Sequence, residues 1–261
     1  MTESSRLKPL SWGPSLIIFL IIASMLYVTH YVLVPAYTAW SGKPYLVGYL
    51  WGWGVTMGLV FAASLVAFKS EGHPTSWQAL SARFRLNRMR RTSTSGQDWL
   101  WTLAILVVAA GAYFSLSFTA RWLASNPIFA PHPAFPPDLG PDGTAHLTPR
   151  QLFGMPLKGQ WWVAGMYFIG WFLNIFGEEF FYRGWLLPRQ ELAFGKYAWL
   201  VNGTMFTFQH WLQPWNFLAI WPGALFMAYV VQRRRNTWLG IVQHGLMNLA
   251  LFVFVLRGVI G

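Results

Sequence analysis

Long apolar segments recur along the chain and dominate its pattern of hydrophobic and polar positions. An α-helix needs roughly 20 mainly apolar residues to cross the hydrocarbon core of a bilayer. Seven segments of about this kind are flanked by turn residues and charges: Leu16–Val34, Tyr45–Phe68, Trp99–Phe118, Trp161 to about Arg183, Tyr197–Trp211, Phe217–Val231 and Trp238–Leu256. The fifth and sixth are short for single spans. The pattern predicts an all-α polytopic membrane helix bundle of about seven transmembrane helices.

The connection over residues 69–98 is long and basic. Trp77, Leu80 and Phe84 recur in it at helical spacing, and they are accompanied by Arg83, Arg85, Arg88 and Arg90. This pattern is typical of an amphipathic helix that lies on an anionic membrane surface. We therefore expect a surface helix in this basic inner loop.

A second long connection covers residues 121–160 and contains eight of the sixteen prolines. Proline interrupts helices, so we expect an outer loop with little regular structure. These features predict two parts. Residues 1–160 form N-terminal transmembrane helices with the inner loop 69–98 and the outer loop 121–160, and residues 161–256 form a second part.

Composition agrees with a membrane protein. Of the 261 residues 55% are apolar and 10% are charged, whereas soluble domains carry about a quarter charged residues. The chain has no Cys, which excludes disulfides, thiol chemistry and Cys-ligated zinc. The net charge of +11 follows from topology rather than from nucleic-acid binding, because an inner N-terminus places fourteen of the nineteen basic residues inside. We expect a multi-pass protein, with a cytoplasmic N-terminus, in a bacterial inner membrane.

Ionisable and amide side chains gather in three of the apolar segments. A charge at the bilayer centre costs about 2.5–3.5 kcal/mol on insertion scales, so such residues are candidates for function. The candidate catalytic residues are Glu178, Glu179, Arg183, His210, His244 and Asn248.

Helical spacing indicates how these residues are arranged. Glu179 and Arg183 are four residues apart, so they share a helix face and can form an ion pair. Glu178 is turned about 100° away from its neighbour. A carboxylate without a full salt bridge in an apolar cleft suits a general base. His244 and Asn248 are also four apart and can both donate hydrogen bonds to an oxyanion.

Three short motifs, which follow one another along the chain, carry a resemblance to a known protein family. They are E-E-F-F-Y-R at 178–183, F-T-F-Q-H at 206–210 and H-G-L-M-N at 244–248. In these signatures, E-E-x-x-x-R, F-x-x-x-H and H-x-x-x-N or D, the chain resembles the CPBP family of CAAX proteases and bacteriocin-processing enzymes, which is related to the type II CAAX prenyl endopeptidases. The resemblance covers roughly residues 161–256 and implies that this second part is a CPBP-type catalytic core. It implies that Glu178 and His210 activate a water, while Glu179 and Arg183 hold the site together.

The last motif, as the resemblance implies, supplies an oxyanion site from His244 and Asn248. The implied activity is hydrolysis of a peptide bond in a membrane-associated or lipidated peptide or protein by a glutamic-type intramembrane protease. The expected partners are that substrate and the lipid bilayer, with no nucleic acid, and no cofactor or metal is expected.

Three alternatives stay open at the level of sequence. A zinc-dependent version of the same protease would use two His and a Glu with an open water position, although no H-E-x-x-H helix is present. A proton-coupled membrane carrier also keeps carboxylates and His at the midplane, but the chain shows no internal repeat. A catalytically silent scaffold would recruit a partner through the basic inner loop.

Overall fold

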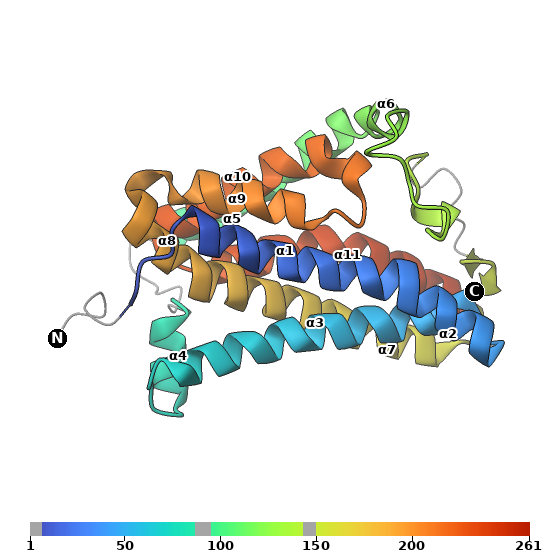
Figure 1. The fold of residues 1–261 in the computed structure, drawn as a ribbon, viewed down its shortest axis with the longest axis horizontal. Helices are drawn as coiled ribbons and strands as arrows, with labels where there is room; N and C mark the ends of the chain where they lie inside the picture. The colour runs from blue at the N-terminus through green and yellow to red at the C-terminus, as the bar shows by residue number, and fades with distance from the viewer. Residues whose placement is uncertain (1–6, 87–94, 143–149) are drawn as a thin grey trace.

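The molecule is a bundle of helices that lie side by side along its long axis (Figure 1). The computed structural model describes residues 7–86, 95–142 and 150–261. Helix α7 packs between α3 and α11, and α10 packs between α5 and α9. The described chain is 77% helical and has almost no sheet, which confirms the predicted all-α membrane helix bundle.

The first half contains α1 (Trp12–Val28), η2 (Thr29–Leu33), α2 (Val34–Ser41), α3 (Tyr45–Ser70), α4 (Trp77–Arg83), α5 (Ser95–Leu116), α6 (Thr119–Ala124) and the 3₁₀ turn η3 (Pro137–Leu139). The first three elements form one continuous helix with a π-helical turn in its middle. This helix ends at Gly42, whose φ of 67° is a conformation that glycine adopts without strain.

The second half begins with two short antiparallel strands and continues with helices. Its elements are β1 (Gln151–Leu152), β2 (Met155–Pro156), α7 (Trp161–Glu178), the π-helix η5 (Glu179–Leu186), α8 (Leu187–Phe194), η6 (Gly195–Tyr197), α9 (Ala198–Gln209), η7 (Pro214–Asn216), α10 (Phe217–Arg234) and α11 (Trp238–Ile260). Helix α7 continues through η5 into α8, so the predicted fourth segment is the first part of a longer helical stretch.

Five helices of the described chain are long and apolar enough to cross a membrane. They correspond to the first, second, third, sixth and seventh predicted segments. The fourth segment is helical but ends in its charged motif, and the fifth forms α9, which has only 12 residues. Side chains along α1, α3 and α5 such as Leu20, Val66 and Val107 are exposed. Their exposure fits an integral membrane protein, because lipid covers such surfaces.

The helix predicted within residues 69–98 is present in the described part as α4 (Trp77–Arg83), but its basic end is not on the surface. Helix α4 has seven residues, and Arg83, Phe84 and Arg85 are all buried in the protein. The guanidinium groups turn inward because they find acidic partners there: Arg83 pairs with Glu71, and Arg85 pairs with Glu191. The predicted Arg88 and Arg90 lie outside the described residues.

The outer loop is mostly irregular, as its prolines predict. Within residues 121–142 and 150–160 its regular structure is the last turn of α6, the turn η3 and the two-residue strands. Phe135 of this loop packs edge-on against Trp215 of η7. The loop therefore covers the end of the bundle where α9 turns into α10.

Candidate active site

The candidate residues lie where the junction of α7 and η5 meets α9 and α11. Close packing at this point depends on glycine. A Cβ on Gly240 of α11 would collide with the Oε2 atom of Glu179, and a Cβ on Gly177 would lie 3.0 Å from the backbone oxygen of Met57. The two glycines let α11 and α3 approach the glutamate pair from different sides.

Glu179 is completely buried and carries two polar contacts. Its Oε1 atom lies 3.3 Å from Nη1 of Arg183, which is also completely buried. The same Oε1 atom lies 3.1 Å from Nδ1 of His244. The Arg183 guanidinium also covers the ring of Phe206, with its carbon 3.9 Å from the ring centre. The ion pair expected from the four-residue spacing is present, and two further elements enclose it.

Glu178 has a different environment from its neighbour. Its side chain is 3% exposed, and its Oε1 atom accepts a hydrogen bond of 3.0 Å from Nε2 of Gln209. Its Oε2 atom has no hydrogen-bond partner among the described residues and lies 3.8 Å from Nε2 of His244. One carboxylate oxygen is therefore held in place, and the other is free to accept a proton or a water.

His244 lies between the two carboxylates. An ionised carboxylate only accepts hydrogen bonds, so Nδ1 of His244 carries the proton that bonds Glu179. The other ring nitrogen, Nε2, faces Glu178. This contact couples the glutamates through one imidazole, an arrangement that helical spacing within α7 and η5 alone does not predict.

His210 is the residue that caps the C-terminus of α9. Its Nδ1 atom donates a 2.8 Å hydrogen bond to the carbonyl of Phe206, because a carbonyl can only accept. The rings of His210 and Phe206 meet edge-on, with centres 4.9 Å apart. The ring of His244 also meets the Phe206 ring edge-on, with centres 6.2 Å apart. Within the described chain, His210 makes no hydrogen bond or ion pair with Glu178 or Glu179. Phe206 separates the two histidines.

Asn248 lies one turn beyond His244 on α11. Its Nδ2 atom donates a 3.1 Å hydrogen bond to the backbone carbonyl of His244. An amide NH₂ group has two N–H donors, so one of them is left for a ligand. Asn248 makes no contact with the glutamates in the part of the chain that is described.

Sequence reasoning missed two amides in this site. Gln209 holds Glu178 directly, and Nδ2 of Asn174 lies 3.4 Å from the sulfur of Met57, one helical turn before Glu178. The signal that could have found both is the same one that marked the histidines, a polar side chain in a strongly apolar segment. Among the described residues, no group of three or more His, Cys, Asp or Glu side chains could hold a metal ion.

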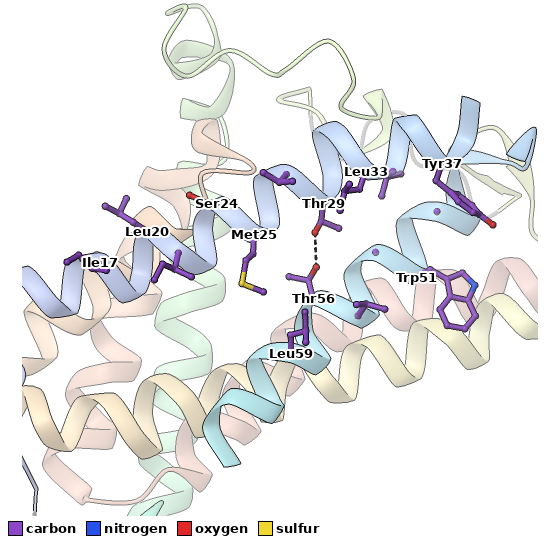
Figure 2. Close-up of a pocket in the computed structure, with 16 residues that line it drawn as sticks. Ile17, Leu20, Ser24, Met25, Thr29, Leu33, Tyr37, Trp51, Thr56 and Leu59 are labelled. Atoms are coloured by element: carbon purple, nitrogen blue, oxygen red, sulfur yellow. Dashed lines mark hydrogen bonds between the residues drawn. The ribbon is translucent and has the colours of Figure 1, made fainter. Parts of the chain in front are cut away.

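An apolar groove of about 990 Å³ lies between the continuous helix α1–η2–α2 and helix α3 (Figure 2). Ile17, Leu20 and Leu59 line it, and at its narrow part Thr29 and Thr56 share a hydrogen bond of 2.9 Å. The next residue of α3, Met57, contacts Asn174 on α7. The groove therefore adjoins the segment of α3 that supports the site.

Comparison with known proteins gives one match. Residues 160–250 match the family model described as type II CAAX prenyl endopeptidase Rce1-like. The matched stretch contains all six predicted site residues, from Glu178 to Asn248. No curated protein matches the chain, and no solved structure matches it.

Proposed function

We propose, from the match of residues 160–250 to the Rce1-like type II CAAX prenyl endopeptidase model, that the chain is a protease of this family that hydrolyses peptide bonds with a water activated by Glu178. The observation that carries the proposal is the asymmetry of the glutamate pair. Oε2 of each glutamate has no hydrogen-bond partner among the described residues. Glu179, however, is paired with Arg183 and its Oε2 packs against Gly240 of α11, whereas Glu178 forms no ion pair with an arginine of the described chain. A free, oriented carboxylate oxygen in a buried site suits a general base.

The proposed reaction begins with a water between Glu178 and the substrate carbonyl. Glu178 takes one proton from the water while the oxygen attacks the carbonyl carbon, which forms a tetrahedral oxyanion. The C–N bond then breaks, and the proton passes from Glu178 to the departing amine. Gln209 supports this role because its hydrogen bond fixes the orientation of the carboxylate.

We assign His210 a share in orienting the water. Its Nδ1 proton is used by the Phe206 carbonyl, so in the neutral ring Nε2 presents a lone pair. That lone pair can accept a hydrogen bond from a water that Glu178 also holds. Since no direct contact joins His210 to Glu178 among the described residues, the water or the substrate itself would connect them.

The oxyanion site is proposed for His244 and Asn248. Asn248 has one free N–H after its bond to the His244 carbonyl. Nε2 of His244 can donate as well when it carries a proton, while Nδ1 stays on Glu179. Both donors lie on α11, and buried donors of this kind stabilise a developing oxyanion most effectively.

The proposed substrate is a membrane-associated or lipidated peptide or protein. The groove supports this choice, because it is apolar and adjoins the α3 segment that contacts Asn174. We propose that the apolar part of the substrate occupies the groove while its scissile bond reaches the glutamates.

The first experiment compares Glu178→Gln with wild type on a fluorogenic peptide offered with and without a lipid chain. The amide keeps the shape of the side chain but cannot accept the proton, so we expect a rate loss of about 100- to 10,000-fold. Asp142→Asn is the matched control, since Asp142 is an exposed acidic residue of the outer loop. Wild-type turnover by Glu178→Gln would end the general-base assignment.

A second arm repeats the wild-type assay after exhaustive chelation. A glutamate-activated water needs no metal, so the rate should be unchanged. Loss of activity that returns with zinc would replace this mechanism with the zinc-dependent one. A wild type that cleaves neither form of the peptide, but transports a ligand, would replace the protease with the carrier.

A further inference from the structure

Arg83 is a buried arginine outside the three motifs that contacts the backbone of the catalytic helix. Arg83 is only 2% exposed, although it belongs to the connection between α3 and α5. Nη1 donates a 2.8 Å hydrogen bond to the carbonyl of Gly184, and Nη2 lies 3.3 Å from the carbonyl of Trp185. Gly184 directly follows Arg183, so Arg83 holds the chain at the end of the E-E-x-x-x-R motif.

The Gly184 carbonyl lies near the point where the π-helix η5 gives way to the α-helix α8, and a proline there removes one of its possible backbone donors. In a regular α-helix it would accept from the backbone N–H four residues later. That position is Pro188, at the start of α8, and proline has no N–H. The guanidinium of Arg83 supplies the donor that Pro188 cannot.

The segment around Arg83 also contacts the other end of the motif. The ring of Phe84 is completely buried and lies 5.1 Å from the ring of Phe180, the residue after Glu179. The same ring packs on Gly184, where a Cβ would lie 3.1 Å from it. Arg83 and Phe84 thus hold the π-helix η5 at Phe180, next to Glu179, and at Gly184, next to Arg183.

Arg83 itself is held by an ionised partner. Its Nε and Nη2 atoms donate to the two oxygens of Glu71, at 2.5 and 2.9 Å, and Arg189 of α8 donates to Glu71 at 2.6 Å. Burial raises the pKa of Glu71, but the hydrogen bonds and charges of Arg83 and Arg189 outweigh that effect, so the net shift is downward. The anchor stays charged at neutral pH. A planar guanidinium can serve Glu71 and two carbonyls at once, which an ammonium cannot.

We propose that Arg83 is a positioning residue of the active site, which holds the Gly184 carbonyl and thereby the π-helical segment that directs Glu178, Glu179 and Arg183 toward His244. The inference rests on the proposed hydrolytic function. It extends the functional unit beyond the motif region, because the residue that orients the glutamates comes from the N-terminal half. A displacement of about 1 Å in a catalytic group is enough to cost about 100-fold in rate.

The test uses Arg83→Met, which keeps most of the side-chain stem and removes every donor. We expect the rate at saturating peptide to fall by about 10- to 100-fold, with KM within about twofold of wild type, because substrate contacts are untouched. Arg85→Met is the matched control. Arg85 is a neighbouring buried arginine that pairs with Glu191 and makes no hydrogen bond to η5 in the described chain.

Recovery of the hydrolysis rate by a second substitution distinguishes a positioning role of Arg83 from a general contribution to stability. Pro188→Ala restores a backbone N–H that can reach the Gly184 carbonyl, so the Arg83→Met, Pro188→Ala double variant should recover at least several-fold of the lost rate. Arg83→Lys should lose less than Arg83→Met, since one ammonium proton can still reach that carbonyl. If Arg83→Met does not fold, Arg83→Lys with and without Pro188→Ala gives the same comparison.

Three results would overturn the inference. They are a full rate for Arg83→Met, an equal rate loss in Arg83→Met and Arg85→Met, and no recovery with Pro188→Ala. Wild-type protein is assayed first on the same peptide. Its inactivity would count against the proposed function, whereas an active wild type with an unaffected Arg83 variant would count against the positioning role alone.

Discussion

Glu179 and Arg183 are both completely buried, and the charge of each is balanced mainly by the other. Glu179 also binds His244, and Arg183 also covers the Phe206 ring. At the scale of residues the site thus divides into Glu179, which is paired with Arg183, and Glu178, which forms no ion pair with an arginine of the described chain. The Glu179–Arg183 pair should matter for stability, and Glu178 for chemistry.

Arg183→Met should therefore destabilise the protein as well as inactivate it. Removing one partner leaves the Glu179 charge buried and unpaired, which costs about 3–5 kcal/mol. The melting temperature in detergent measures this loss. The double variant Arg183→Met, Glu179→Gln should lose less than the sum of the single losses, because both charges are gone. Single variants that melt like wild type would contradict the structural role of this pair.

Asn248→Ala tests the oxyanion site. Loss of one such donor typically lowers the catalytic rate by about 100- to 1,000-fold. KM should change little, because the oxyanion exists only in the transition state and its intermediate. Single-turnover hydrolysis at saturating peptide is the measurement, and Met247→Ala, at the adjacent position on α11, is the control. A variant that cleaves as fast as wild type would remove Asn248 from the mechanism.

At the scale of elements, function depends on how helices with irregular turns are packed. The π-helix η5 follows Glu178 directly, and π-helical turns of this kind are frequent at functional sites. The continuous helix α1–η2–α2 borders the groove with α3. These two irregular helices provide the junction that holds the candidate site residues and the apolar surface beside it.

Leu59→Trp tests whether the groove binds the apolar part of the substrate. Leu59 lines the groove (Figure 2), and an indole there would occupy part of its volume. KM for the lipidated peptide should rise several-fold, while the rate at saturation and the KM for the unlipidated peptide stay unchanged. Val66→Trp is the control, because Val66 is exposed on the same helix outside the groove. Equal effects of both variants on both peptides would exclude the groove as a substrate site.

At the scale of the whole molecule, the elongated bundle has two ends that can lie on opposite sides of a membrane. The turn after α2 and the turn after α8 lie at opposite ends of its long axis (Figure 1). Lys43 belongs to the first turn and Lys196 to the second. We propose that the end with Lys196 faces the cytoplasm of a bacterial cell, since an inner N-terminus places fourteen of nineteen basic residues on that side.

The absence of Cys from the chain allows a direct test of this topology. Single Lys43→Cys and Lys196→Cys variants can be exposed to a membrane-impermeant thiol reagent in cells whose outer membrane is permeabilised and whose inner membrane is intact. Lys43→Cys should be labelled, and Lys196→Cys should be labelled only after the inner membrane is lysed. The reverse pattern would invert the proposed orientation.

The sequence alone determined the features that depend on one helix at a time. Apolar segment lengths predicted the membrane bundle, and the four-residue spacing predicted the Glu179–Arg183 pair, because both follow from helix geometry. The motifs located the site within residues 161–256, and the family match over 160–250 contains it. The assigned roles of the six residues stay predictions.

Only the tertiary structure decided which helices meet and which side chains face one another. The contact of His244 with both glutamates depends on the rotation of α11 and on the missing side chain of Gly240. Arg83 appeared in the sequence as part of a basic surface. It turns inward because Glu71, from the same connection, and the Gly184 carbonyl, which is distant in the chain, form a buried set of acceptors. Helical periodicity describes the face of one helix, whereas these contacts require the packing of several helices.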